Sequence, residues 1–398
     1  MLRFPGFDEP WEHKELLYYL VENTDRNKQL KFGKENVLSV SGEYGIVNQI
    51  AFQGRSFAGE SVADYHVVET DDIVYTKSPL KANPYGIIKV NNGVPGIVST
   101  LYAVYHPLKT VVPRFVDFYF SNDLRLNKFL KPLVNIGAKH DMKVNNTFVL
   151  TGMVVFPPLR EQQKIVDFLT ILDRRIDVQR KKVEALKKYK RGLLSREFGQ
   201  QENGDLNNRY VGKLKDYFHL SSGSTPSSTN RAFYSGNIRW VSSGELKPKY
   251  LCETSQHISS EAVSSCNLRE YPANTLLVAM YGLEAAGVRG TASILSVPAT
   301  ISQACMAIQQ TGEIDIEYLY YWYIYNGQWI GIRIAQGTKQ QNLSTDTLGN
   351  LRIHAPSCSK QKKVCKLLSQ IDYLIEKEGQ KIDLLSSAKR GLLQQLFI

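Results

Sequence analysis

A chain of 398 residues is long enough for two or three domains, and its 43% hydrophobic and 22% charged residues are ordinary for a globular protein. Its apolar runs stay well below the roughly 18 residues of a membrane-spanning helix, and it does not begin with the charged and then apolar pattern of a signal peptide, so we expect a cytoplasmic protein. The formal net charge of +11 is concentrated, because residues 157–198 and 356–398 together contribute +10. A charged run on a helix is usually a solvated face, so the charge alone supports DNA binding only weakly.

The cysteines are an odd set confined to the second half of the chain. They form no Cys-x-x-Cys pair and no histidine lies at zinc-finger spacing, so we expect reduced thiols and no metal site. They are Cys252, Cys266, Cys305, Cys358 and Cys365.

Residues 1–156 contain short β-rich runs separated by turn signals such as Asn91-Asn92-Gly93, which predicts a domain centred on a sheet. Residues 115–130 have a helical pattern. Residues 154–156 form a short predicted strand that leads into Pro157-Pro158, and these prolines favour the start of a helix. The β-rich runs are VLSV, GIVNQIAF, YHVVETDDIVYTK, YGIIKVNNGVPGIVST and LYAVYHP.

Residues 157–198 form a predicted long helix whose apolar residues step by four and three, the seam of a coiled coil. From Glu161 to Leu194 this pattern predicts a rod of roughly 51 Å. Polar residues break the seam at Gln179 and Lys190. The apolar seam positions are Ile165, Leu169, Leu172, Ile176, Val183, Leu186 and Leu193.

Residues 199–355 begin with a polar, Gly- and Asn-rich tract that is typical of a linker, and then become β-rich from Val211. This second segment echoes the first. The run SQACMAI (302–308) corresponds to STLYAVY (99–105), and the run EYLYYWYIY (317–325) corresponds to RFVDFYF (114–120). Gly337-Thr338-Lys339 matches Gly137-Ala138-Lys139.

Residues 356–398 repeat the first helix, with 14 identities over 42 aligned positions that include Gln162 with Gln361 and the sequence KRGLL. Polar residues interrupt the second seam at the equivalent Glu378 and Lys389. Gly379 weakens this helix by about 1 kcal/mol relative to alanine. The apolar seam positions are Val364, Leu368, Ile371, Ile375, Ile382, Leu385 and Leu392.

Two helices with the same apolar seam can bury their seams against each other, and the intervening segment is long enough to return the second helix antiparallel to the first. The alternative is that each helix packs its apolar stripe against its own domain. We therefore predict a mixed α/β fold with a pseudo-twofold internal repeat. Its parts are a first sheet-centred domain (1–156), a helix (157–198), a second sheet-centred domain (199–355) and a C-terminal helix (356–398), with the two helices paired as an antiparallel coiled coil.

Three motifs are specific in combination. Leu2-Arg3-Phe4-Pro5-Gly6-Phe7 precedes Glu9-Pro10-Trp11, Pro157-Pro158-Leu159 with Glu161-Gln162 heads the first helix, and KRGLL stands near the end of both helices. With these motifs the chain resembles the specificity subunits of type I restriction-modification systems over essentially its full length. The second helix departs from that pattern at its start, with Pro356-Ser357-Cys358 and Lys360-Gln361.

The resemblance implies two target recognition domains, residues 1–156 and about 199–355, each reading one half of an asymmetric bipartite site on double-stranded DNA. It also implies that the paired helices act as a spacer and as a docking surface for two methyltransferase subunits, with restriction subunits in systems that have them. The complex would methylate adenine. This chain would bind no cofactor itself, because S-adenosylmethionine, and ATP with Mg for a restriction subunit, belong to the partners.

Candidate DNA contacts lie in loops that flank the predicted strands. Glutamine can pair with adenine, arginine or lysine with guanine, and tyrosine can pack on sugars or methyl groups. The alternative for each residue is an ordinary solvated loop. Lys339-Gln340-Gln341 and the equivalent Lys139-His140-Asp141 are the best matched pair. The full set is Lys77, Tyr85, Lys139, His140, Tyr281, Arg289, Lys339, Gln340 and Gln341.

Catalytic motifs are absent from the sequence. Phe156 stands before Pro157-Pro158 where an amino-methyltransferase needs an amide side chain, and no Gly-rich nucleotide or phosphate loop is present. Asp71-Asp72 and Glu245 lack a matching partner for nuclease chemistry. We expect a non-catalytic chain with no metal site. Two other functions stay open, a coiled-coil scaffold or adaptor without a DNA role and a stand-alone DNA-binding regulator.

Overall fold

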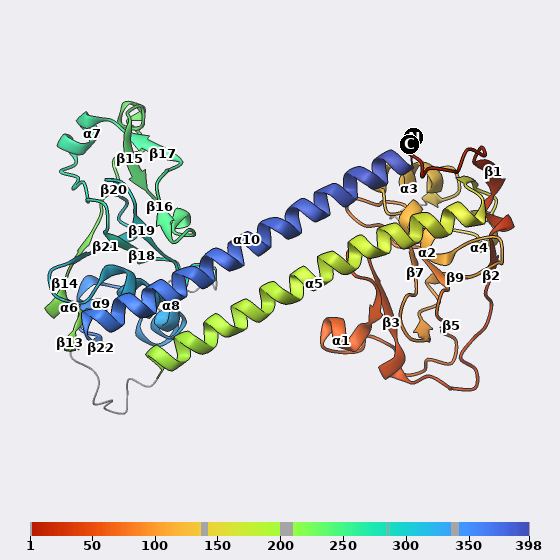
Figure 1. The fold of residues 1–398 in the computed structure, drawn as a ribbon, viewed down its shortest axis with the longest axis horizontal. Helices are drawn as coiled ribbons and strands as arrows, with labels where there is room; N and C mark the ends of the chain where they lie inside the picture. The colour runs from red at the N-terminus through yellow and green to blue at the C-terminus, as the bar shows by residue number, and fades with distance from the viewer. Residues whose placement is uncertain are drawn as a thin grey trace. The chain divides into compact units, whose positions relative to one another are not determined.

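The computed structural model describes residues 2–136, 142–199, 210–283, 285, 287–335 and 342–397. The chain forms two compact units, of which unit 1 is Met1–Arg180 with Gln380–Ile398 and unit 2 is Lys181–Gly379. Two continuous helices, α5 (Leu159–Phe198) and α10 (Cys358–Leu396), each begin in one unit and end in the other (Figure 1). Each unit therefore contains a sheet-centred part and a portion of both helices.

Unit 1 is built on a four-stranded antiparallel sheet with the strand order β2, β9, β6, β7. Successive side chains of a strand point to opposite faces. In the inner strand β6, Ile73 and Tyr75 enter one apolar core while Val74 enters another, and all three are fully buried. The sheet is thus covered on both faces. Its strands are β2 (Leu20–Glu22), β6 (Ile73–Thr76), β7 (Ile88–Val90) and β9 (Tyr102–Pro107).

Helices cover the face of this sheet that Ile73 and Tyr75 enter. The residues predicted as one helical stretch form two helices, α2 (Pro113–Tyr119) and α3 (Asp123–Leu130). The break arises because the Asn122 side chain accepts a hydrogen bond from the backbone N–H of Arg125 and so caps a new helix. Residues of α5 and of the last turn of α10 pack into the same core.

The opposite face is covered by short strands, and here one prediction was partly wrong. The run GIVNQIAF is a strand only as far as Asn48, whose side chain accepts from the backbone N–H of Ala51 and starts the helix α1 (Gln49–Gln53). The other elements of unit 1 are β1 (Glu12–Glu15), η1 (Leu16–Tyr18), η2 (Lys34–Asn36), β3 (Leu38–Ser41), β4 (Gly45–Asn48), β5 (His66–Val68), β8 (Gly96–Val98), β10 (Asn135–Ile136), β11 (Met142–Lys143), α4 (Asn146–Val149) and β12 (Met153–Phe156).

Unit 2 contains a five-stranded sheet with the order β14, β21, β18, β19, β16 and a three-stranded sheet with the order β17, β15, β20. Both are mixed, because β16 runs parallel to β19 and β20 runs parallel to β15. The elements are β13 (Tyr210–Lys213), α6 (Leu214–Tyr217), β14 (Phe218–Ser222), η4 (Arg231–Tyr234), β15 (Ile238–Val241), η5 (Ser243–Glu245), β16 (Tyr250–Leu251), β17 (Gln256–Ile258), α7 (Ser260–Ser265), β18 (Leu276–Ala279), β19 (Ala292–Leu295), β20 (Thr300–Ile301), β21 (Cys305–Gln310), α8 (Ile316–Trp329), the π-helical turn η6 (Ile330–Ile334), α9 (Thr345–Gly349) and β22 (Arg352–Ala355).

The two units repeat one topology. The order β2, β9, β6, β7 recurs as β14, β21, β18, β19, and a ribbon of two strands precedes each long helix, β1 with β12 and β13 with β22. The helices α2 and α8 follow the equivalent strands β9 and β21. The predicted mixed α/β fold with an internal repeat is confirmed. The units differ in what lies between the equivalent strands. Between β2 and β6, unit 1 has η2, β3, β4, α1 and β5, and between β14 and β18, unit 2 has η4, β15, η5, β16, β17 and α7.

The two long helices pair antiparallel inside each unit. In unit 2, Lys182 bonds to Glu378 and Lys190 to Asp372, so residue numbers rise along α5 as they fall along α10. In unit 1, Asp173 bonds to Lys389, while earlier residues of α5 share a core with the end of α10. The antiparallel pairing is confirmed. None of the described helices is both long and apolar enough to cross a membrane, and all five cysteines are free thiols.

Candidate nucleic-acid interface and docking helices

Two candidate DNA contacts of unit 1 lie at the end of its sheet. Lys77 directly follows β6 and is half-buried, and its ammonium group donates a hydrogen bond to Asn146 Oδ1 at 3.2 Å. Burial lowers the pKa of Lys77, and the charge of Arg26 lowers it further, whereas Glu22 acts in the opposite direction. The amide of Asn146 donates in turn to Glu22 Oε1 at 2.8 Å. Lys77, Asn146 and Glu22 therefore form a connected polar row of donors and acceptors.

Tyr85 is held more firmly than a solvated loop residue. Its ring packs against the core of unit 1, and its carbonyl oxygen accepts a hydrogen bond from the Tyr75 hydroxyl at 2.7 Å. Gly86 follows with φ +89, where a side chain would be strained and would meet the backbone oxygen of Thr76. The loop that carries Tyr85 is consequently fixed to the sheet.

The candidates of unit 2 lie in the connection between β18 and β19. Tyr281 is 36% exposed and stands two residues after β18. Arg289 is half-buried, and its Nε donates to the carbonyl oxygen of Leu283 at 2.6 Å. The carbons of its side chain lie against Gly331, where an added Cβ would come within 2.7 Å of Arg289 Cγ. Backbone contacts thus fix the direction of the Arg289 side chain.

The best matched pair of predicted loops lies outside the described residues. Lys139, His140, Lys339, Gln340 and Gln341 belong to this group, so they stay predictions. In the sequence, the first loop connects β10 to β11, and the second precedes α9.

The predicted seam residues are all buried or half-buried, and some of them also satisfy the alternative in which a helix packs on its own domain. Ile165 and Leu169 belong to the core of unit 1, and Leu368 belongs to the core of unit 2. The fully or nearly buried positions are Ile165, Leu169, Ile176, Val183, Leu368 and Ile371, and the half-buried ones are Leu172, Leu186, Leu193, Val364, Ile375, Ile382, Leu385 and Leu392.

The polar interruption at the KRGLL motif is explained by one ion pair in each unit. Lys389 donates to Asp173 Oδ1 at 2.5 Å in unit 1, and Lys190 donates to Asp372 Oδ1 at 2.5 Å in unit 2. Asp173 also accepts from Arg114, and Asp372 from the hydroxyl of Tyr321. Such half-buried pairs add little net stability but disfavour other registers, because a shifted helix would leave the charges unpaired.

A buried glutamine fixes the start of each long helix. Gln162 donates to the carbonyl oxygen of Pro157 at 2.9 Å and accepts from the backbone N–H of Val112 at 3.0 Å. Gln361 makes the equivalent bonds with Pro356 at 2.9 Å and with Asp315 at 2.8 Å. The sequence repeat showed this identity but could not show its cause.

Helix pairing in unit 1 leaves an outer groove that the seam pattern did not predict. We define the outer groove as the groove of about 720 Å³ that is lined by side chains of α5 and α10, most of them aliphatic or basic. Ile171, Val178 and Leu384 are 56%, 66% and 70% exposed. Adjacent exposed aliphatic residues are typical of a protein interface. The remaining lining residues are Arg174, Arg175, Gln179, Lys381 and Leu385.

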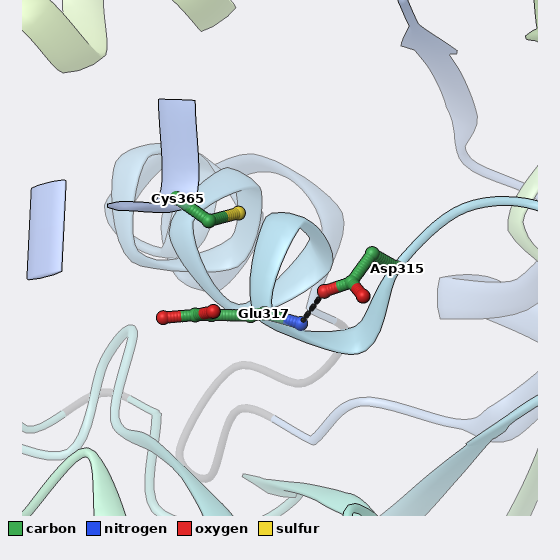
Figure 2. A group of neighbouring side chains, drawn as sticks. All are labelled: Asp315, Glu317 and Cys365. Atoms are coloured by element: carbon green, nitrogen blue, oxygen red, sulfur yellow. Dashed lines mark hydrogen bonds between the residues drawn. The ribbon is translucent and has the colours of Figure 1, made fainter. Parts of the chain in front are cut away.

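Among the described residues, one group in unit 2 has ligand atoms close enough for a metal ion, namely Asp315, Glu317 and Cys365 (Figure 2). Lys249 already bonds to the Glu317 carboxylate, which also accepts from the Ser369 hydroxyl at 2.6 Å. Burial raises the pKa of the Cys365 thiol, which disfavours the thiolate that a metal needs. Asp315 caps α8 by accepting from the backbone N–H of Glu317 at 2.8 Å, the bond drawn in Figure 2. The group fits a structural junction with Lys249 as its cation.

Comparison with known proteins identifies the family. The family model described as the type I restriction modification DNA specificity domain matches residues 62–188 and 208–386, which is more than half of the chain. The chain belongs to this family. The two matched segments each contain most of one sheet-centred part and continue into the long helix that follows it.

Several curated relatives are specificity subunits of type I restriction enzymes. The MjaIX subunit of Methanocaldococcus jannaschii is 29% identical over 192 residues, which are 47% of this chain and 43% of the relative. The EcoR124I/EcoR124II subunit of Escherichia coli is 25% identical over 176 residues, 44% of this chain and 42% of the relative. The chain thus spans less than half the length of these two. The putative MjaX subunit of M. jannaschii is 21% identical over 417 residues, 98% of this chain and 93% of the relative.

Solved structures of the family share the fold. The type I restriction-modification S subunit from M. genitalium superposes with a TM-score of 0.61 at 12% identity and covers 100% of this chain and 98% of that one. A chain from a study of complex assembly and conformational transition of the type I R-M system gives 0.57 at 16% identity, covering 100% and 99%. At these identities the likeness shows the fold alone.

Proposed function

We propose that this chain is a DNA-sequence reader that recognises an asymmetric, bipartite site, one half with the sheet-centred part of unit 1 and the other half with that of unit 2. The observation that carries the proposal is the duplicated scaffold with unlike insertions. The strand order is the same in both units, whereas the segments between equivalent strands differ. Equal scaffolds with different insertions suit two readers that attach to DNA alike but recognise different bases.

Candidate base and phosphate contacts sit on these scaffolds. In unit 1, the row of Lys77, Asn146 and Glu22 presents fixed donors and acceptors, as direct readout of base edges requires. In unit 2, Arg289 is fixed through Leu283 and has the chemistry to pair with guanine. Tyr85 and Tyr281, and the two loops with Lys139, His140, Lys339, Gln340 and Gln341, complete the proposed set.

We further propose that α5 and α10 set the spacing between the readers and dock two methyltransferase subunits. The exposed Ile171, Val178 and Leu384 of the outer groove support a protein partner on the helix pair. The chain itself performs no chemistry in this proposal. The cytoplasmic complex would methylate adenine with S-adenosylmethionine bound by the partners, and a restriction subunit, where present, would cleave DNA with ATP and Mg.

The experiment that tests this function compares the methylated bases in the genome of the host with and without the gene for this chain. Loss of one bipartite adenine-methylated motif, restored by complementation, is the expected result. An unchanged methylation pattern would contradict the proposal. Gel shift on duplex DNA then separates the other two functions, because a scaffold shifts no DNA and a stand-alone regulator shifts it without a methyltransferase.

A further inference from the structure

Unit 1 contains a cleft that none of the functions above uses. We define the aromatic cleft as the space of about 1070 Å³ between β1, α3, β12 and the end of α10. Trp11, Tyr119, Phe129 and Phe397 supply its rings, and Leu124 at the rim is 82% exposed. At its floor, Gly152 lets Phe129 and Leu133 pack directly on the backbone, because a Cβ there would come within 2.6 Å of both side chains.

Arg125 is a basic residue of this cleft whose guanidinium group has no carboxylate partner among the described residues. It is half-buried, and its guanidinium lies 4.8 Å from the ring centroid of Tyr119 and 5.4 Å from that of Phe397. Burial lowers the pKa of Arg125, which means that its charge is partly desolvated. Among the residues that the structure describes, no carboxylate pairs with Arg125, whereas Arg3 pairs with Glu161. A desolvated cation without an anion favours binding of one.

The remaining lining residues indicate the chemistry of an occupant. Lys128 adds positive charge to the walls, which also contain His13, and none of the described lining residues is acidic. Met153 is 57% exposed and, with Leu124, makes the rim apolar. Contacts to DNA phosphates are polar and charged, so an exposed aliphatic rim fits a protein segment better. A segment with an apolar side chain and a nearby carboxylate would match both features.

The equivalent position of unit 2 has different neighbours. Phe198 is the repeat counterpart of Phe397, and both side chains are nearly buried. The Phe198 ring lies 5.2 Å from that of Tyr318 and 6.2 Å from that of Tyr325, both on α8. The corresponding helix of unit 1, α2, ends at Tyr119, before a counterpart of Tyr325. The two equivalent phenylalanines are therefore both buried, but they have different aromatic neighbours.

We propose that the aromatic cleft docks a segment of a methyltransferase subunit, which inserts an apolar side chain against Trp11 and Tyr119 and places a carboxylate on Arg125. The proposal rests on the proposed function, and it adds a site that is distinct from the outer groove. Because the cleft and Arg125 belong to unit 1, the methyltransferase subunit that binds there depends on Arg125, whereas the other one does not.

The test uses the full chain and the methyltransferase subunit that is recovered with it. R125E and L124E are the test variants, and K131E and L101E are matched controls on exposed positions of unit 1 outside the cleft. Native mass spectrometry should show two bound methyltransferase subunits for the wild type and both controls, and one for R125E and L124E. Calorimetry should show one of the two binding events weakened at least about tenfold. Thermal unfolding is measured in parallel, and L124E keeps the test valid if R125E disturbs the fold, since Leu124 is 82% exposed.

Three other results would contradict either the docking at the aromatic cleft or the proposed function. If R125E and L124E bind two methyltransferase subunits as tightly as the wild type, this inference is overturned while the proposed function stands. If the variants instead lose affinity for duplex DNA alone and keep the methyltransferase, the cleft contacts DNA and the inference is also overturned. If the wild type binds no methyltransferase subunit, the proposed function itself falls.

Discussion

Replacing Gln162 with alanine should destabilise unit 1 strongly, because this side chain is only 1% exposed and serves two backbone groups. The substitution removes the bond to Pro157 O (2.9 Å) and the bond from Val112 N–H (3.0 Å). Each hydrogen bond contributes about 1 kcal/mol, and a buried polar group left without a partner costs about 1 to 3 kcal/mol. The expected loss in the free energy of unfolding is therefore about 2 to 4 kcal/mol.

Urea unfolding with hydrogen exchange measures this loss and locates it. Q162A should speed exchange around Val112 and the first turn of α5, and Q361A around Asp315 and the first turn of α10. The control is Q163A, since Gln163 is exposed and its side chain bonds to Asp167 on its own helix. This substitution should cost less than about 0.5 kcal/mol. A loss for Q162A as small as that of the control would refute the argument that these glutamines fix the helix starts.

Three other predictions follow from the same structure. Burial, with the charges of Arg26 and Lys77, lowers the pKa of His66 to about 4. Between about pH 6.5 and 4, the His66 imidazole therefore stays neutral in the folded protein but is protonated in the unfolded chain. Stability should fall by up to roughly 3 kcal/mol as the pH drops from about 6.5 to 4, and the difference in unfolding free energy between wild type and H66Q should narrow over that range; a constant difference would contradict this. Replacing residues 1–156 with those of a relative should change one half of the methylated sequence, and a change in both halves would show that the units read DNA jointly. The purified chain should transfer no methyl group from S-adenosylmethionine to DNA without a partner, and transfer by the chain alone would disprove the assignment of chemistry to other subunits.

The repeated features of the fold were predictable because the sequence contains two copies of each pattern. The seams of α5 and α10, with their equivalent polar interruptions, predicted an antiparallel pair, and the ion pairs of Lys190 with Asp372 and Lys389 with Asp173 show how those interruptions are accommodated. Local capping was harder to predict. Asn48 and Asn122 each start a new helix within what the apolar pattern presents as one continuous element.

The sites were less predictable, because they depend on contacts between distant segments. Asn146 is 69 residues from Lys77, and no spacing rule connects them. The aromatic cleft combines both ends of the chain, as shown by Trp11 and Phe397, whose ring centroids are 6.1 Å apart. The outer groove was not predicted because its exposed aliphatic residues Ile171, Val178 and Leu384 lie off the seam, and only their exposure beside the paired helices distinguishes them.

The most direct test of the account inserts one heptad after Val183 and one after Ile382. Two added helical turns keep the seam in frame and lengthen each helix by about 10 Å. At roughly 3.4 Å per base pair, the gap between the two half-sites should grow by up to about three base pairs. Sequencing of the methylated sites should show the same two half-site sequences with this longer gap. An unchanged gap in a fully active complex would contradict the central claim that α5 and α10 set the distance between two DNA readers.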